Sequence, residues 1–63
     1  MPMVHIQLFP GRTREQKAKA VAEITAAIER TLGATPQSTD IIFMEVPKSE
    51  WARGGLLFDE SGR

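Results

Sequence analysis

The sequence predicts a small α/β subunit: a β-α-β unit with a parallel two-stranded sheet and a short C-terminal hairpin, in a single domain over residues 1–63. Three observations predict this fold. Residues 3–9 alternate between two faces, residues 13–32 repeat apolar positions at helical spacing, and residues 40–46 form a nearly continuous apolar run. A strand, a long helix and a strand in this order form a right-handed crossover, so the two strands should be parallel.

The first strand is predicted over residues 3–9, "MVHIQLF". One face is wholly apolar and carries Val4, Ile6 and Leu8. The other face is mixed and carries Met3, His5, Gln7 and Phe9. Alternation with β-branched residues is typical of a strand, and the Pro10–Gly11 pair should end it because both residues interrupt a ladder.

The helix is predicted from about Thr13 to Leu32. Thr13 and Gln16 have the spacing of a capping box, in which each side chain accepts a hydrogen bond from the other residue's backbone N–H. Apolar residues recur on one stripe at Val21, Ile24, Ile28 and Leu32. Gly33 is the expected residue just past the helix, since glycine readily adopts the left-handed conformation that ends many helices.

The second strand is predicted over residues 40–46, and its apolar run suggests burial on both faces. Residues 47–53 should then leave the sheet. The Gly54–Gly55 pair permits a tight turn, and "LLF" at 56–58 could form a short final strand, which completes a hairpin. The last residues, 59–63, are expected to be frayed.

A chain of 63 residues has a stability problem, because a domain of this size buries only about 60% of its unfolded surface. There is no cysteine and only one histidine, His5, so disulfides and a Cys/His zinc site are excluded. The helix can cover only one face of a two-stranded sheet, and a second copy is the natural cover for the other. The sequence therefore predicts a chain that is stable only as a homo-oligomer.

The charge balance limits the possible partners. Eight Lys and Arg residues balance eight Asp and Glu residues, so the chain lacks the basic surface of a nucleic-acid-binding protein or a membrane-surface protein. A ribbon-helix-helix DNA-binding dimer would also need a second helix. No apolar stretch approaches the roughly 20 residues of a transmembrane helix, and the N-terminus does not have the pattern of a signal peptide. With no cysteine, the chain is expected to be cytoplasmic.

The catalytic inventory is short. His5 lies on a strand face, where a structural role is more common than that of a general base, and no phosphate-binding loop or metal motif is present, so no cofactor or metal is expected. Pro2 has two interpretations: a proline at a strand edge, or a free secondary amine after removal of Met1. An α-amino group titrates near ~7.7–8.0. Apolar burial or a nearby guanidinium would lower that pKa and make the amine a base near neutral pH.

Several short motifs occur together along the chain. They are "P-x-x-x-I-x-L" from Pro2, "GRTREQK" at the start of the helix, "AI-x-R-x-L" near its end, "E-V-P-K" after the second strand, and then an aromatic residue and "GG". Their order and spacing resemble the 4-oxalocrotonate tautomerase family, and the resemblance extends from Pro2 to about Gly55. It favours the interpretation of Pro2 as a functional amine.

The resemblance implies a subunit that assembles as a hexamer, a trimer of dimers, and an isomerase that needs no cofactor. Pro2 would act as general base and then acid on a small unsaturated 2-hydroxy or 2-oxo acid, often in aromatic catabolism. Arg12 matches the arginine that binds the substrate carboxylate, a role that suits a planar, permanently charged guanidinium. Trp51 matches the aromatic wall of the pocket. From position alone, Arg12 could also be an exposed residue before a helix, and Trp51 an interface anchor.

One position departs from the family pattern. The second family arginine, which helps to polarise the substrate carbonyl, is replaced here by Asp40, whose carboxylate would repel an anionic substrate. Another cation could take its place: Arg53 is the first candidate, followed by Arg14 and Lys48. In the 3-chloroacrylate dehalogenase branch a glutamate stands at the position of Arg53, which argues against such a dehalogenase or hydratase, although Glu50 is close in sequence.

Two functions of different classes therefore remain. The first is a cofactor-independent tautomerase with Pro2 as its base and Arg12 as its carboxylate ligand. The second is an oligomeric binding module of the same fold with weak turnover or none, which Asp40 favours.

Overall fold

The computed structural model describes residues 2–59. Met1, whose removal is expected, and residues 60–63 of the expected frayed end lie outside the described residues. The elements in chain order are β1 (Met3–Leu8), α1 (Arg14–Leu32), the 3₁₀ helix η1 (Pro36–Ser38), β2 (Asp40–Glu45), the 3₁₀ helix η2 (Lys48–Glu50), β3 (Ala52–Arg53) and β4 (Leu56–Leu57). The predicted order of elements is confirmed.

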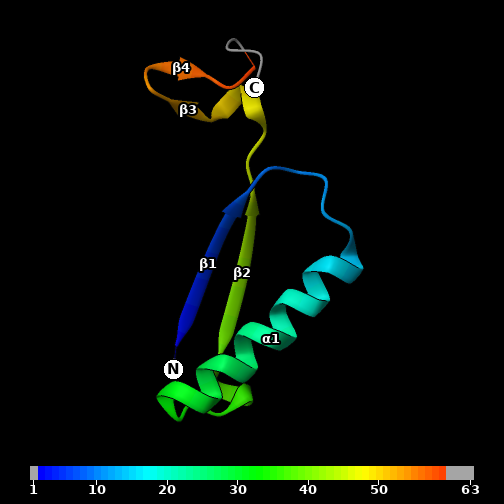
Figure 1. The fold of residues 1–63 in the computed structure, drawn as a ribbon, viewed down its shortest axis with the longest axis vertical. Helices are drawn as coiled ribbons and strands as arrows, with labels where there is room; N and C mark the ends of the chain where they lie inside the picture. The colour runs from blue at the N-terminus through cyan, green and yellow to red at the C-terminus, as the bar shows by residue number, and fades with distance from the viewer. Residues whose placement is uncertain (1, 60–63) are drawn as a thin grey trace.

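The two long strands form a parallel sheet, as the β-α-β pattern predicts. Met3 lies opposite Asp40 at the start of the ladder and Leu8 lies opposite Glu45 at its end. Figure 1 shows both arrows running in the same direction, with α1 beside one face and descending to the end of the sheet where the chain begins. Helix and sheet thus form two layers.

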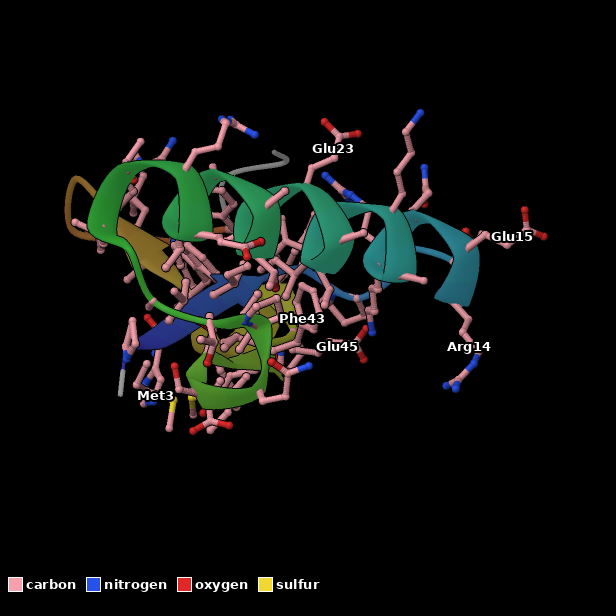
Figure 2. The ribbon with its side chains drawn as sticks, turned by 90° about the horizontal axis from the view of Figure 1, so that it is seen from below. Met3, Arg14, Glu15, Glu23, Phe43 and Glu45 are labelled. Carbon is pink, nitrogen blue, oxygen red and sulfur yellow. The ribbon has the colours of Figure 1, made fainter. Side chains whose placement is uncertain are left out.

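The start of α1 is fixed by the predicted capping box. The Gln16 N–H donates to the Thr13 hydroxyl at 3.1 Å, and the Thr13 N–H donates to the Gln16 side-chain oxygen at 2.9 Å. Gly33 follows the helix with φ 73°, the left-handed conformation that an L side chain adopts only with strain. In Figure 2, Glu15 and Glu23 project from the helix into solvent, whereas Phe43 of β2 lies between the helix and the sheet.

Alternation along β1 and β2 directs one apolar set toward α1. Val4, Ile6 and Leu8 are half-buried on this face, together with Ile41 and Phe43. On the opposite face, Ile42 is 42% exposed and Met44 is 45% exposed. The expectation that β2 is buried on both faces is therefore wrong for the single chain, because no second layer covers that face.

The C-terminal hairpin lies beyond the end of the sheet (Figure 1). Ala52 pairs with Leu57, and Arg53 pairs with Leu56. Gly54 and Gly55 have φ values of 64° and 85°, the pair of positive angles that a two-residue type I′ turn requires. The predicted hairpin is confirmed.

A single chain leaves its core incomplete. The Cα radius of gyration is 15.0 Å, whereas a compact chain of this length has about 11 Å. Among residues 2–59, Phe58 is the one buried hydrophobic residue, at 6% exposed. Also within this range, no helix combines the length and apolar character needed to cross a membrane. The exposed sheet face is consistent with the predicted association between copies, which the single chain does not show.

This exposed face provides a direct test of association. Ile42→Lys places an ammonium group on it, and burying an unpaired charge costs several kcal/mol. We expect association to weaken about tenfold or more, since each 1.4 kcal/mol is a factor of ten, as measured by size-exclusion chromatography with light scattering. The matched control is Leu32→Lys, because Leu32 is 70% exposed at the end of α1 and away from this face. Equal association of the two variants would contradict the expectation.

Candidate active site

Pro2 and Asp40 lie together where the sheet begins. Pro2 is half-buried, and its carbonyl accepts a hydrogen bond at 3.0 Å from the backbone N–H of Asp40. Asp40 is exposed and stands opposite Met3 in the ladder. We call this the Pro2 end of the sheet. Two of the predicted site residues are thus neighbours within one chain.

Trp51 belongs to a cluster of three aromatic rings at the other end of the sheet. Its ring centroid lies 4.6 Å from that of Phe9 and 6.3 Å from that of Phe58, and Phe9 and Phe58 are 5.2 Å apart. The rings are tilted by 45–57°, an arrangement that aromatic quadrupoles favour. We call these three residues the aromatic cluster. It attaches the hairpin to the end of β1.

The position of Phe9 corrects the sequence prediction. Phe9 was expected to be the last residue of the strand, on the face opposite the helix, but β1 ends at Leu8 and Phe9 packs on Trp51. The sequence also contains a signal for the position of Phe58. A two-residue turn at Gly54–Gly55 places Trp51 and Phe58 opposite each other just beyond β3 and β4, where the Phe58 N–H donates to the Trp51 carbonyl at 2.8 Å.

Two cations lie over the rings of this cluster. The Arg53 guanidinium carbon is 5.0 Å from the centroid of Phe58, and the Lys48 Nζ is 5.8 Å from the centroid of Phe9. Both distances are within the range of cation–π attraction. The cluster therefore presents apolar ring surface with two positive groups at its border, which suits a planar, conjugated anion.

Arg12 lies on the helix side of the same end. It lines a hollow of about 210 Å³ together with Leu8, Gln16 and Phe43, among others. A guanidinium beside an apolar floor can hold the carboxylate of a ligand whose carbon chain packs below it. The sequence predicted Arg12 for this role from the family resemblance, and its location is compatible with that role.

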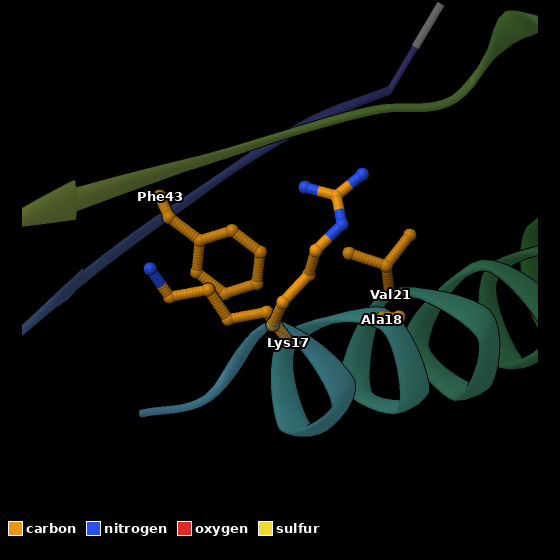
Figure 3. A pocket seen from close by; sticks show the side chains of 5 residues that line it. Lys17, Ala18, Val21 and Phe43 are labelled. Carbon is orange, nitrogen blue, oxygen red and sulfur yellow. The ribbon is translucent and has the colours of Figure 1, made fainter. Parts of the chain in front are cut away.

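A larger hollow of about 470 Å³ lies between α1 and β2. Its lining residues are Arg14, Lys17, Ala18, Val21 and Phe43, and Figure 3 shows the Lys17 side chain beside the ring of Phe43, with Val21 farther along the helix. The Lys17 Nζ is 5.7 Å from the Phe43 centroid and donates to a Glu45 carboxylate oxygen at 2.6 Å. Its charge is therefore already compensated within the chain.

Glu50 shares a third hollow with Trp51. This hollow is about 270 Å³ and is also lined by Gln7, Val46 and Ala52. A carboxylate beside an aromatic wall could hold a water molecule, which is the arrangement that a hydratase-like variant would need. However, this hollow lies at the end of the sheet opposite Pro2.

One chain does not bring the predicted base and the predicted cations together. Pro2 precedes β1, whereas Arg12 and the aromatic cluster follow its end (Figure 1). At about 3.3 Å per residue, Pro2 and Phe9 are separated by roughly 20 Å. Arg12, Trp51 and Arg53 therefore lie far from Pro2 and Asp40 within a single chain.

Known proteins resemble this chain over almost its whole length. A family model described as "Tautomerase enzyme" matches residues 2–60. A probable tautomerase of Lactococcus lactis is 44% identical over 57 residues, which cover 90% of this chain and 93% of the relative. A probable tautomerase of Ralstonia nicotianae is 39% identical over 56 residues, which cover 89% and 80% of the two chains.

Solved structures give the same result for the fold. A structure of the 4-oxalocrotonate tautomerase isozymes from Methylibium petroleiphilum superposes with a TM-score of 0.90 at 34% identity, covering 97% of this chain and 95% of the other. A heterohexamer 4-oxalocrotonate tautomerase from Chloroflexus aurantiacus superposes with a TM-score of 0.86 at 30% identity, covering 95% of this chain and 97% of the other.

The aromatic cluster can be tested with the single tryptophan of the sequence as its probe. Phe58→Ala removes the buried ring, a change that costs about 3 kcal/mol in a packed site. We expect the hairpin to detach from Phe9 and the fluorescence emission of Trp51 to shift to longer wavelength. Leu57→Ala, at a position that is 36% exposed, is the control and should leave the emission unchanged. An unshifted Phe58→Ala spectrum would contradict the cluster's role.

Proposed function

Because the chain belongs to the tautomerase family, we propose that it is a cofactor-independent isomerase that moves a proton on a small unsaturated 2-hydroxy or 2-oxo acid. Pro2 acts as general base and then general acid once Met1 has been removed. The observation that carries this proposal is the family match over residues 2–60, which begins at Pro2 itself.

The chemistry follows from a secondary amine at the chain terminus. Unprotonated, the Pro2 nitrogen takes a proton from the enol oxygen, or from a carbon beside the carbonyl, and becomes an ammonium. The electron pair that is released spreads over the conjugated oxygen and carbons. The ammonium then returns the proton to a different atom of the same system, so the product is an isomer and the enzyme is regenerated.

Arg12 and Trp51 supply binding and environment in this proposal. Arg12 holds the substrate carboxylate with its planar fork of donors. Trp51 excludes water from the amine, and a less hydrated site disfavours the protonated amine. Arg53, 5.0 Å from the Phe58 ring centroid, is the proposed second cation. Arg14 and Lys48 are the less favoured candidates for that role.

We further propose that each active site is shared between two copies. If the free edges of two β1 strands pair antiparallel, the start of one strand lies beside the end of the other. Pro2 of one copy then approaches Arg12 and Trp51 of its partner, which removes the separation of roughly 20 Å within one chain. The unpaired edges of a two-stranded sheet support such pairing, since a sheet this small is marginal alone.

The complete assembly that we propose is a hexamer, a trimer of such dimers, in which the exposed sheet face with Ile42 and Met44 is covered by neighbouring copies. The heterohexamer among the structural relatives supports this stoichiometry. A cytoplasmic enzyme acting on 2-oxo acids from aromatic catabolism is the proposed setting, and a chain without cysteine is compatible with a reducing compartment.

A second candidate is a binding module of the same fold with weak turnover or none. Asp40 favours it, because this residue is the hydrogen-bonded neighbour of Pro2 across the strands, and a carboxylate there cannot stabilise a developing enolate as a cation would. A hydratase-like variant finds some support in Glu50, which shares a hollow with Trp51.

The role of the amine is tested first. Intact mass spectrometry should show a chain that lacks Met1, because an attached residue would convert the Pro2 nitrogen to a non-basic amide. Pro2→Ala should lower kcat/KM for ketonisation of phenylenolpyruvate by about 10²–10⁴-fold, the usual contribution of a general base. A wild-type chain that works with Met1 attached, or a fully active Pro2→Ala variant, would contradict the mechanism.

The shared site is tested by mixing two inactive variants. Pro2→Ala and Arg12→Ala chains are unfolded together in equal amounts and refolded. About half of the dimers then contain one chain of each variant. Each of these mixed dimers has one intact site out of two, so about one quarter of the wild-type rate should return. The same variants refolded separately and then combined are the control. If each site lay within one chain, mixing would restore nothing.

A further inference from the structure

Strand β2 carries a carboxylate at each of its two ends, and only one of them is neutralised. Glu45, at the last position, accepts a hydrogen bond from the Lys17 ammonium at 2.6 Å. Asp40, at the first position, forms no ion pair with any residue between 2 and 59. Within the part of the chain that the structure describes, no side-chain cation therefore pairs with the carboxylate at the Pro2 end of the sheet.

Asp40 is also the charged residue nearest to Pro2 along the hydrogen-bonded ladder. Its backbone N–H donates to the Pro2 carbonyl at 3.0 Å, so the two residues are direct neighbours across the strands. The last turn of α1, which contains Glu29 and Arg30, also reaches this end of the sheet (Figure 1), so it brings one charge of each sign.

The opposite end of the chain carries cations as well as the carboxylates Glu15, Glu45, Glu50 and Asp59, and Lys17 is already paired with Glu45 there. Its cations come from the β1–α1 connection, the first turn of α1 and the C-terminal segment: Arg12, Arg14, Lys17, Lys48 and Arg53. In the shared site proposed above, the end of one copy that carries Arg12 and Arg53 faces the Pro2 end of another. A bound ligand would thus meet cations at one side and the Asp40 carboxylate at the other.

We infer, on the basis of that proposed function, that Asp40 determines specificity by charge: the site takes acids with one carboxylate and rejects dicarboxylates. The single carboxylate binds to Arg12, and the part of the substrate beside Pro2 and Asp40 is uncharged. An ionised aspartate only accepts hydrogen bonds. Asp40 therefore tolerates a hydroxyl group on the part of the substrate beside it but repels a second carboxylate. The site thus excludes dicarboxylates through an unfavourable contact.

Binding measurements test this inference without any need for turnover. The probes are trans,trans-muconate and its monomethyl ester, which have similar shapes but differ by one negative charge. We expect the wild type to bind the monoester about tenfold more tightly than the diacid, and Asp40→Asn to remove most of that difference. Asp40→Arg should reverse the preference, so that this variant binds the diacid more tightly than the monoester. Glu23→Gln, on the outer face of α1 (Figure 2), removes a charge elsewhere and should leave the ratio unchanged.

Turnover measurements separate the failure of this inference from failure of the proposed function. Asp40→Asn is nearly isosteric and keeps the backbone hydrogen bond to Pro2, and size-exclusion chromatography verifies its assembly. If the wild type ketonises phenylenolpyruvate but Asp40→Asn leaves both the affinity ratio and the relative rate on 2-hydroxymuconate unchanged, the specificity inference is wrong and the isomerase remains. If no acid is turned over but the affinity ratio responds to Asp40→Asn, the charge selection stands and the isomerase is wrong.

Discussion

The uncovered face of the two-stranded sheet is the constraint on which the other features depend. One helix can cover one side of β1 and β2, and residues 2–59 form no further element that covers the other side. Ile42 and Met44 remain exposed there, and Phe58 is the one buried hydrophobic residue within 2–59. Neither disulfides nor a Cys/His zinc site can compensate, since the sequence has no cysteine. The proposed association between copies would supply the burial that the single chain lacks.

The single crossover, which leaves this sheet face uncovered, also explains why the candidate site is divided. A subunit with a single crossover places the start of β1 and the start of β2 at one end and the loops that follow them at the other. Pro2 and Asp40 belong to the first end, and Arg12 and the aromatic cluster belong to the second. Stability and catalysis would thus both need more than one copy. A substitution that weakens assembly should consequently reduce activity even when it lies far from Pro2.

Much of this could be predicted from local sequence signals. Period-two alternation, the Thr13–Gln16 capping box and the Gly54–Gly55 turn are short-range features, and the structure confirms the elements that they predict. The packing of Phe9 could not be predicted in that way. Its partner Trp51 is remote in sequence, and the position of Trp51 depends on how the hairpin packs. The separation of Pro2 from Arg12 within one chain follows from the topology rather than from any motif. The roles of both residues rest on the family resemblance, since neither spacing nor composition identifies a catalytic proline.

The length of β1 also has an evolutionary consequence. Because Pro2 and Arg12 lie at opposite ends of this strand, a mutation at one end leaves the local geometry of the other intact. In the proposed shared site, one paralogue could lose its terminal amine and the other its guanidinium after a gene duplication, and mixed particles would still contain complete sites. Neither gene could then be deleted without loss of activity, so the two would be retained together.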